Sequence, residues 1–292
     1  MNPYVFMTDS DSDLPFSYVD ERDISMVYMP YIMDGQEYMD DLGRNGGQKD
    51  YFDKMRAGAA PTTSLLPMGA YLELFEPILE QGKDILFIAF SSQLSGTQQN
   101  ALNAREELLE KYPDRKIEIV DTLSISVPQA ILVLKAYELY REGRPMEEVA
   151  QWVEENKLHA QAWFTVDDLR YLRRGGRISA AAAVAGTLLD LKPVITENRE
   201  GKLVNSDKVR GRKSALRLLA DRAAENIDDP ANAMPVIIHA DAPEDAQRLE
   251  KLLHERIPGL PEVQTWYVGP VIGAHCGPGT IAVCFFGKER PQ

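Results

Sequence analysis

Short apolar runs alternate along this chain with segments whose apolar residues have helical spacing, and this alternation constrains the fold more than any other feature. The run ILFIAF at residues 85–90 is apolar at every position, which is typical of a strand covered on both faces of its sheet. The intervening segments carry apolar residues at i, i+3 and i+4, as amphipathic helices do. The pattern therefore predicts an α/β fold with right-handed crossovers between strands.

The predicted elements form two groups along the chain. The expected strands are Tyr4–Met7, Ile24–Met29, Ile85–Phe90, Ile117–Val120, Ala162–Val166, Pro193–Thr196, Val236–Ala240, Val263–Val268 and Ile281–Phe286. The expected helices include Leu94–Lys111, Pro128–Arg141 and Ala242–Arg256. A chain of 292 residues exceeds one comfortable core, so we predict two α/β domains, over residues 1–157 and 158–292. The first is expected to hold a Rossmann-like parallel sheet and the second a mixed sheet.

Composition and charge exclude several classes of function. The formal net charge of −13 argues against a nucleic-acid partner, because such binding relies on Lys and Arg to neutralise phosphates. No apolar run approaches the roughly 20 residues needed to cross a bilayer, and the N-terminal residues do not resemble a signal peptide, so we expect a cytoplasmic protein. Cys276 and Cys284 lack the spacing of a metal site, so neither a metal nor a cofactor is expected, and Cys284 reads as a core residue.

Small polar residues follow three of the predicted strands. They are Thr8-Asp9-Ser10, Ser91-Ser92 and Asp121-Thr122. In open parallel sheets, ligands bind outside the carboxyl ends of the strands. The same residue types are also the favoured N-caps of helices. The sequence leaves both interpretations open.

The turn SSQLSG at residues 91–96 carries a more specific signal. Ser95 and Gly96 stand at the start of a predicted helix, where free backbone amides and the helix dipole favour an anion. The turn has neither a lysine nor a longer glycine-rich loop, so the site suits a carboxylate better than a triphosphate. A second hydroxyl cluster, PTTS at residues 61–64, also enters a predicted helix, and capping remains an alternative for both.

Of the four histidines, His275 is the best candidate for a functional residue. It lies in the segment GPVIGAHCGPG, where glycines and prolines set its position through the backbone. His239 ends an apolar strand and His254 lies on a polar helix, so we expect both to be structural or solvated. His159 is expected at the surface.

An arginine-rich turn, YLRRGGRIS at residues 171–179, is a local positive feature in this acidic chain. Gly175-Gly176 is expected to end one helix, and Ser179 is expected to cap the next. The alanine run at 180–186 predicts a helix of small side chains. Such a helix permits either close packing or room for a long apolar ligand.

Eight stretches in this order resemble the DegV family of bacterial lipid-binding proteins. They are VFMTDSDSDLP, PTTS, FSSQLSGTQQNA, EIVDTLSIS, YLRRGGRIS, LKPVI, KVRGRKSAL and GPVIGAHCGPGTIAVCF. The resemblance runs over nearly the whole chain. It implies two α/β domains with a ligand tunnel between them that holds a long-chain fatty acid.

The resemblance also implies a function and a site. A DegV-like carrier has no catalytic machinery of its own. It supplies the fatty acid to a separate kinase subunit, which phosphorylates the carboxylate to an acyl phosphate for phospholipid synthesis. Residue by residue, Thr63 and Ser95 would contact the carboxylate, with the Gly96 amide nearby and His275 completing the site.

The resemblance also implies a role for three arginines near the tunnel mouth or at the kinase contact, namely Arg177, Arg210 and Arg212. A carrier of this kind is also expected to contact a membrane transiently. The chain departs from the family at Leu65-Leu66-Pro67 and at the proline of DTLSISVPQ, which bears on the tunnel lining and chain preference.

Two other functions remain open. A sensor that signals through another protein would share the same pocket. An acyl hydrolase or esterase would use Ser95 and His275, although Ser95 lacks the GxSxG turn of such enzymes.

Overall fold

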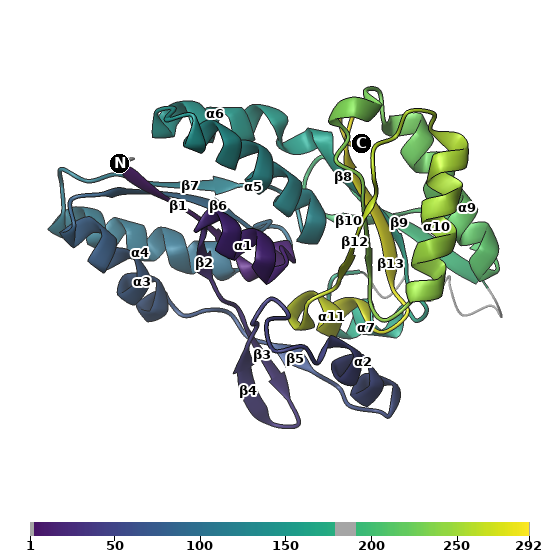
Figure 1. Ribbon diagram of the computed structural model, residues 1–292. Coiled ribbons are helices and arrows are strands. Elements are labelled where there is room, and N and C mark those ends of the chain that lie inside the picture. The colour runs from purple at the N-terminus through teal and green to yellow at the C-terminus, as the bar shows by residue number, and fades with distance from the viewer. Residues whose placement is uncertain (1–2, 179–190, 292) are drawn as a thin grey trace.

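The computed structural model describes residues 3–178 and 191–291, and in it two β-sheets stand next to each other with helices around them (Figure 1). One sheet has four strands in the order β2-β1-β6-β7, and the other has six in the order β10-β9-β8-β13-β11-β12. The alanine-run helix predicted at 180–186 and its cap at Ser179 lie outside the described residues.

The four-stranded sheet is parallel throughout. Its strands are β1 (Tyr4–Asp9), β2 (Ser25–Val27), β6 (Asp84–Ala89) and β7 (Ile117–Asp121). Its helices are α1 (Phe16–Arg22), α3 (Met68–Glu80), α4 (Thr97–Lys111), α5 (Ser126–Arg141) and α6 (Met146–Asn156), and the short 3-10 helix η1 (Ser10–Ser12) follows β1. Helices α3 and α4 cover one face, and α5 and α6 cover the other (Figure 1).

The apolar character of β6 follows from this arrangement. Ile85, Phe87 and Ala89 belong to the buried cluster formed with α3 and α4. The alternate residues Leu86 and Ile88 belong to the cluster formed with α5 and α6. Because successive side chains of a strand point to opposite faces, a strand covered on both faces needs apolar residues at every position.

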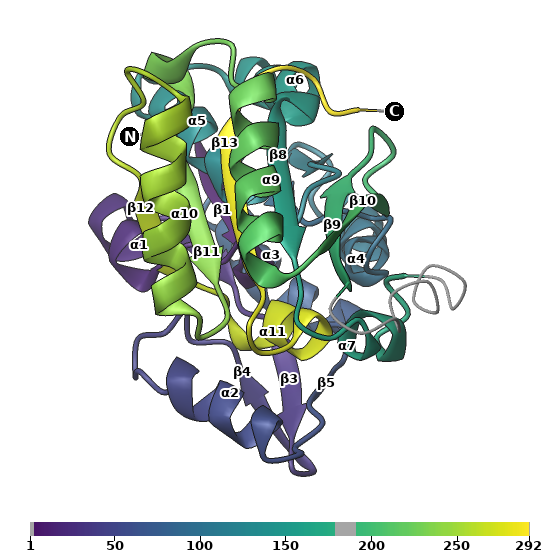
Figure 2. The ribbon, with the colours of Figure 1, turned by 90° about the vertical axis from the view of Figure 1, so that its right-hand side faces the viewer.

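The six-stranded sheet is mixed, since only β11 and β12 run parallel and the other neighbours are antiparallel. Its strands are β8 (Ala160–Thr165), β9 (Leu191–Glu197), β10 (Leu203–Arg210), β11 (Val236–His239), β12 (Gln264–Tyr267) and β13 (Ile281–Phe286). Its helices are α7 (Arg170–Arg174), α9 (Arg212–Asn226), α10 (Pro243–Arg256) and α11 (Pro270–Cys276), with 3-10 turns η2 (Lys157–His159) and η3 (Pro230–Asn232). Helices α9 and α10 lie side by side on its outer face (Figure 2).

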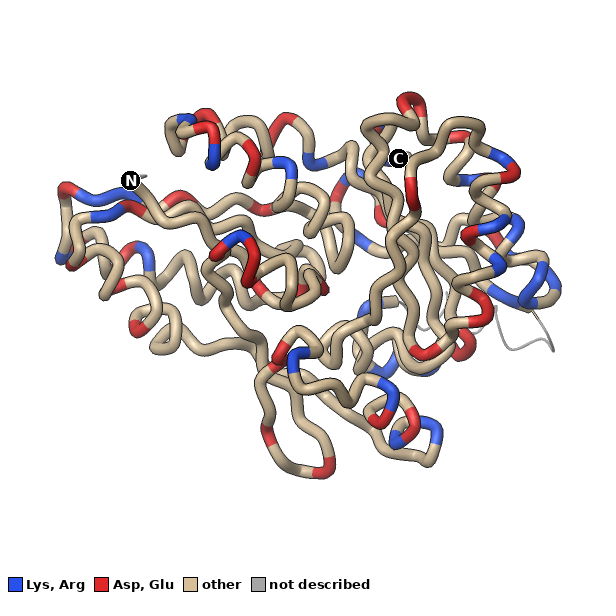
Figure 3. The backbone as a smooth tube through the Cα atoms, in the orientation of Figure 1, with Lys and Arg blue, Asp and Glu red and all other residues tan. Residues whose placement is uncertain are grey.

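The inner face of the six-stranded sheet faces α5 and the four-stranded sheet. Ala162, Phe164 and Cys284 belong to the same buried cluster as α5, whereas Trp163 and Val283 pack under α9 and α10. Strands β8, β11 and β13 carry no charged residue, and they form the uncharged middle of the six-stranded sheet (Figure 3).

A small antiparallel sheet projects away from the two large ones (Figure 1). It consists of β3 (Pro30–Met33), β4 (Gln36–Met39) and β5 (Thr62–Thr63), and α2 (Gln48–Arg56) lies beside it. The apolar pattern of the sequence does not predict these strands, because they are short and β4 is exposed along its whole length. Strand β5 nevertheless carries Thr63, one of the predicted site residues.

The predicted α/β fold with one parallel and one mixed sheet is confirmed, with local differences. The strand expected over Ile24–Met29 ends at Val27, because the Met29 amide leaves the ladder and donates to Ser10 Oγ. The helix expected from Leu94 begins at Thr97, because the amides of Leu94 and Ser95 close a turn onto the Ser91 carbonyl. The domain division at residue 157 stays a prediction. No helix among residues 3–178 and 191–291 is long and apolar enough to cross a membrane.

Candidate functional site

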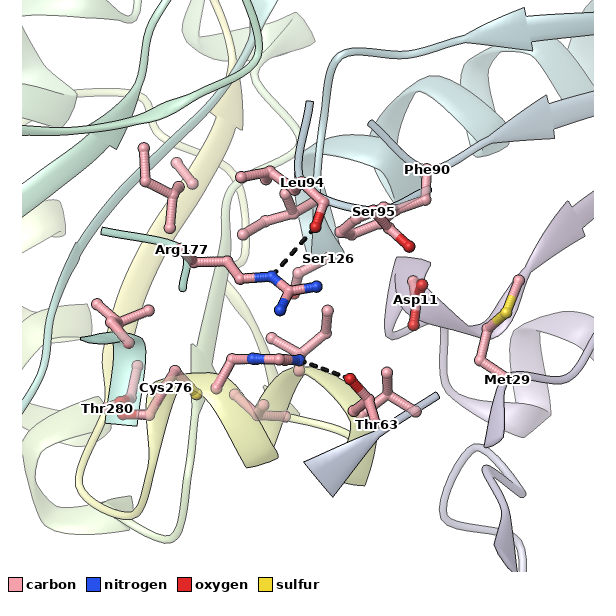
Figure 4. Close-up of a pocket in the computed structure, with 18 of the residues that line it drawn as sticks. Asp11, Met29, Thr63, Phe90, Leu94, Ser95, Ser126, Arg177, Cys276 and Thr280 are labelled. Carbon is pink, nitrogen blue, oxygen red and sulfur yellow. Dashed lines mark hydrogen bonds between the residues drawn. The ribbon is translucent and has the colours of Figure 1, made fainter. Parts of the chain in front are cut away.

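A cavity of about 310 Å³ lies between the two large sheets, and we call it the inter-sheet cavity. Its volume falls within the range of small-molecule sites, which is about 300–1,000 Å³. Its polar lining residues are Asp11, Thr63, Ser64, Ser95, Thr97, Ser126, Arg177, His275 and Thr280. The remaining lining is apolar or sulfur-containing, so the cavity suits a ligand with a long apolar part and a small polar part (Figure 4).

The apolar wall comes from alternate residues on the inner face of the mixed sheet. Ala162 and Phe164 of β8, Ala282 and Cys284 of β13, and Ile238 of β11 all line the cavity. Three of the five have small side chains, and small side chains on a buried face leave space that larger ones would fill. Cys284 is 1% exposed, as expected for a core residue, and it forms part of this wall.

Thr63 and His275 form the clearest polar contact in the cavity (Figure 4). The Oγ1 of Thr63 lies 2.9 Å from Nε2 of His275, across 212 positions of sequence. The pairing of Thr63 with Tyr31 in the small sheet holds β5 in place, and His275 lies in the last turn of α11. The small sheet that the sequence did not predict is therefore what brings Thr63 to the histidine.

Gly175 determines the position of the imidazole from the other side. A Cβ atom on Gly175 would lie 2.1 Å from Nδ1 of His275, so any larger residue at 175 would displace the ring. The Nδ1 atom is buried and has no hydrogen-bond partner among the described residues.

The imidazole is held neutral. Burial lowers the pKa of His275 to about 4, and the nearby positive charges of Arg177 and Arg174 add to this shift. A neutral ring carries one proton, and a buried N–H without an acceptor is costly. The proton therefore belongs on Nε2, which donates to Thr63 Oγ1. The hydroxyl proton of Thr63 is then free to be donated to a ligand.

Ser95 and Gly96 form the start of α4. The Ser95 Oγ accepts a hydrogen bond from the Thr97 amide at 3.2 Å and donates to Thr97 Oγ1 at 3.0 Å. Gly96 is the N-cap residue, and no side chain caps the helix there. Ser95 and Thr97 line the inter-sheet cavity, and Gly96 lies between them in the chain. The structure therefore brings Thr63, Ser95 and His275 to one cavity.

Arg177 also reaches this cavity. Its Nε donates to the Leu94 carbonyl at 3.1 Å, which links the segment after α7 to the turn before α4. Its guanidinium points across the cavity toward Asp11 (Figure 4). Arg177 is thus the cationic group among the described residues that line the cavity.

The other two predicted arginines do not line the cavity. The Nε of Arg212 donates to Asp245 Oδ2 at 2.7 Å and its Nη2 to the Gly279 carbonyl at 2.5 Å, so this side chain is bound within the chain. Arg210 is exposed at the end of β10.

The other three histidines do not line the inter-sheet cavity. His239 is buried, and its Nδ1 accepts from the Ala242 amide, while His254 is exposed. His159, expected at the surface, is partly buried and stacks on Phe286.

The polar residues at the strand ends fasten neighbouring loops. Asp9 accepts from the Phe90 amide at 2.8 Å, and Thr122 donates to the Ala89 carbonyl at 2.8 Å. None of the three strand-end groups lines the inter-sheet cavity, so a structural role is favoured over a binding one. That role is loop fastening and not the expected helix capping, because Asp9 stands at the N-cap of η1 without a side-chain bond and the N-caps of α4 and α5 are Gly96 and Ile125. The described residues also contain no cluster of His, Cys, Asp or Glu suited to a metal ion.

Sequence reasoning missed Asp11 and Ser126, which also line the cavity. Asp11 belongs to the segment TDSDSD, whose repeated acids were a signal that the strand-end interpretation did not use. Ser126 has a φ of 52°, in the left-handed region, and donates to Asp13. Its backbone conformation cannot be inferred from its residue type.

Comparison with known proteins gives a consistent result. The family model described as "Uncharacterised protein, DegV family" matches residues 5–288. A DegV domain-containing protein of Clostridium perfringens is 42% identical over 290 residues, covering 99% of both chains.

Two solved structures are similar over nearly the whole chain. The first is a fatty-acid-binding DegV family protein from Thermus thermophilus, with 32% identity and a TM-score of 0.84, and the match covers 98% of this chain and 100% of that one. The second, a stearic acid-binding protein from Eubacterium ventriosum, has 26% identity and a TM-score of 0.85, and covers 98% of each chain.

Proposed function

Because this chain belongs to the DegV family, we propose that it binds a long-chain fatty acid in the inter-sheet cavity and presents the carboxylate to a separate kinase subunit. That subunit would phosphorylate the carboxylate with ATP, and the acyl phosphate would feed phospholipid synthesis in the cytoplasm. The observation that carries the proposal is a mainly apolar cavity with the Thr63–His275 pair and Ser95 among its polar residues. The fatty acid binding stated for the two structural neighbours supports it.

Burial of the acyl chain supplies the affinity. Transfer of one CH₂ from water to an apolar site is favourable by about 0.8 kcal/mol, so a chain of palmitate length gains far more than the head group loses on desolvation. The charge-free inner wall from β8, β11 and β13 provides such a site. The volume and shape of this wall would set the preferred chain length.

The head group would be held mainly by uncharged donors. The Thr63 hydroxyl and the Gly96 amide would supply hydrogen bonds, and His275 orients Thr63. The Ser95 hydroxyl would turn from Thr97 Oγ1 toward the carboxylate on binding. Without several donors, a buried carboxylate would have a raised pKa and would take up a proton. A carboxylate held without a direct lysine partner keeps its oxygen available as a nucleophile toward ATP on the kinase subunit.

The arginines would divide between two roles. Arg177 would lie at the mouth of the cavity, close to the head group. Arg210, with the neighbouring Lys208 and Lys213, is exposed and available to a partner, whereas Arg212 is bound by Asp245. Transient contact with a membrane would allow the fatty acid to be loaded.

The direct test is mass spectrometry of lipids extracted from denatured, purified protein. We expect about one long-chain fatty acid per chain, and acyl phosphate only when a fatty acid kinase subunit and ATP are added. Protein from lipid-replete cells that carries no acyl chain would contradict the proposal.

An acyl hydrolase is the runner-up. It requires a serine bonded to a histidine that an acid orients. Here Ser95 bonds to Thr97, His275 bonds to Thr63, and Nδ1 of His275 has no partner among the described residues. This geometry favours binding over hydrolysis. The hydrolase predicts turnover of a chromogenic ester that Ser95→Ala abolishes, and the carrier predicts none.

A further inference from the structure

The carboxyl group of Asp11 is the feature of the cavity that the proposed function leaves unexplained. Asp11 lies in η1, directly after β1, and is 5% exposed. Its Oδ1 is buried and has no hydrogen-bond partner among the described residues. A buried polar atom left without a partner destabilises the fold, so such an atom in a ligand cavity indicates a missing partner.

The neighbouring buried aspartates differ in this respect. Asp9, Asp13 and Asp40 each accept a hydrogen bond from a backbone amide at 2.8 to 2.9 Å. Asp11 faces the cavity beside Ser95 and opposite the guanidinium of Arg177 (Figure 4). Its carboxyl therefore lies among the groups assigned to the ligand's head group.

We propose that Asp11 is a further ligand-binding residue, which as a neutral carboxylic acid donates a hydrogen bond to the carboxylate of the fatty acid. This inference rests on the proposed function, because it assumes an anionic head group in this cavity. The O–H of one acid and the oxygen of an ionised carboxylate form a short, charge-assisted hydrogen bond, which is stronger than a bond between neutral groups.

The charges around the cavity support the neutral form. The groups that face Asp11 are Asp9 and Asp13 on its own segment, Asp40 from the loop after β4, Tyr71 from α3, and Arg177 from the segment after α7. Burial raises the pKa of Asp11 well above its usual value, the three aspartates add to this shift, and Arg177 opposes it.

When a carboxylate is bound, the positive charge of Arg177 compensates its negative charge. His275 is neutral and compensates no further charge. An ionised Asp11 would leave a second negative charge facing the ligand, which further favours its protonation. If Asp11 is ionised in the free protein, binding takes up one proton from solvent.

A different role for Asp11, as a counter-ion of Arg177, makes the opposite prediction for one substitution. Asparagine has no charge and cannot replace a counter-ion. It does carry an N–H donor, so it can replace a neutral carboxylic acid. Asp11→Asn and Asp11→Ala therefore separate the two roles.

The experiment is titration of delipidated protein with palmitate by calorimetry at pH 7. We expect Asp11→Asn to bind within about threefold of the wild type and Asp11→Ala to bind about tenfold or more weakly, as for the loss of one hydrogen bond to a charged group. Ser12→Ala is the matched control, because Ser12 lies in the same turn and its hydroxyl, among the described residues, bonds to the Asp9 carbonyl alone. It should bind as the wild type does.

Two further readouts distinguish a binding role from a structural one. Wild-type affinity should fall as the pH rises through the pKa of Asp11, because the ionised form has no proton to donate, and Asp11→Asn should not show this fall. The ligand-free Asp11→Ala protein should melt no lower than the wild type, because it loses an unpartnered buried carboxyl.

Wild-type affinity in Asp11→Ala, or equal weakening in both variants, would overturn the inference and leave the proposed function standing. A wild-type protein that binds no palmitate would overturn both.

Discussion

At the scale of single residues, the site depends on one close approach between a glycine and a histidine. The imidazole of His275 packs against the backbone at Gly175, and this contact directs its Nε2 toward Thr63. The φ of Gly175 is −72°, so the glycine is needed for space and not for an unusual backbone conformation.

The first prediction concerns this contact. Gly175→Ala should displace the imidazole, break its bond to Thr63 and weaken palmitate binding about tenfold, the usual effect of losing one hydrogen bond to a charged ligand. Gly69→Ala is the control, because a Cβ there meets no atom within 4 Å. Calorimetric titration measures both, and unchanged binding in Gly175→Ala would show that the ring position does not matter.

The second prediction separates binding from helix capping at Ser95. Ser95→Ala should reduce fatty acid retention strongly, measured by mass spectrometry of the purified protein. It should lower the free energy of unfolding by only about 0.5–2 kcal/mol, as for a lost bond to a first-turn amide. The exposed Ser92→Ala is the control. Global unfolding of Ser95→Ala would instead favour a purely structural role for this serine.

At the scale of elements, the C-terminal segment ties the two large sheets together. Arg290 is 2% exposed, and its Nε donates to the Ala160 carbonyl at 2.7 Å. Its Nη atoms donate to Leu123 and Ser124, in the loop before α5. Glu197 of β9 lies 3.3 Å from the same guanidinium and accepts from the Ile125 amide at 2.9 Å. This buried ion pair therefore spans the contact between the sheets that form the cavity.

The third prediction follows from the cost of breaking a buried ion pair. Arg290→Met should lower the free energy of unfolding by about 3–5 kcal/mol, because the contact with Glu197 and the hydrogen bonds of Arg290 to Ala160, Leu123 and Ser124 are lost together. Burial already raises the pKa of Glu197 to about 7, so without Arg290 its carboxyl takes up a proton near neutral pH. Adding Glu197→Gln, which keeps an acceptor for Ile125, should recover part of the loss. The exposed pair Arg199–Glu289 provides the control, and Arg199→Ala should cost less than about 1 kcal/mol. Urea denaturation measures the wild type and the three variants, and equal costs at 290 and 199 would contradict the assignment.

At the scale of the whole molecule, several carboxyl groups of this acidic chain are buried, and together they make the free energy of unfolding depend on pH. Burial raises the pKa of Asp13 to about 8 and that of Asp40 to about 7, and it also raises those of Asp9 and Asp11. In the unfolded chain the pKa of these carboxyls is about 4. At pH values between about 4 and about 8, the folded state therefore binds more protons than the unfolded state.

The fourth prediction is that stability falls as the pH rises from about 6.5 to 8. A carboxyl with a raised pKa stabilises the fold fully below its unfolded pKa and loses that contribution as the pH passes its folded pKa. His275 has the opposite sign, because its pKa is lowered to about 4, but its effect is complete once the pH exceeds about 6.5. Urea denaturation at the two pH values should show a loss of about 1 kcal/mol or more. A flat or rising stability would show that these carboxyls are ionised in the folded protein.

The sequence by itself determined the larger strands and helices, because the spacing of apolar residues along a short segment decides which face of an element can be buried. It also indicated Thr63, Ser95 and His275, because hydroxyls at helix starts and a histidine between glycines are local features that resemble a known family. Only the tertiary structure decided that Thr63 meets His275, that Arg177 faces Asp11, and that Arg212 is bound within the chain. These outcomes depend on contacts between residues far apart in sequence, and on burial, which shifts protonation by removing water from groups whose neighbours no local pattern reveals.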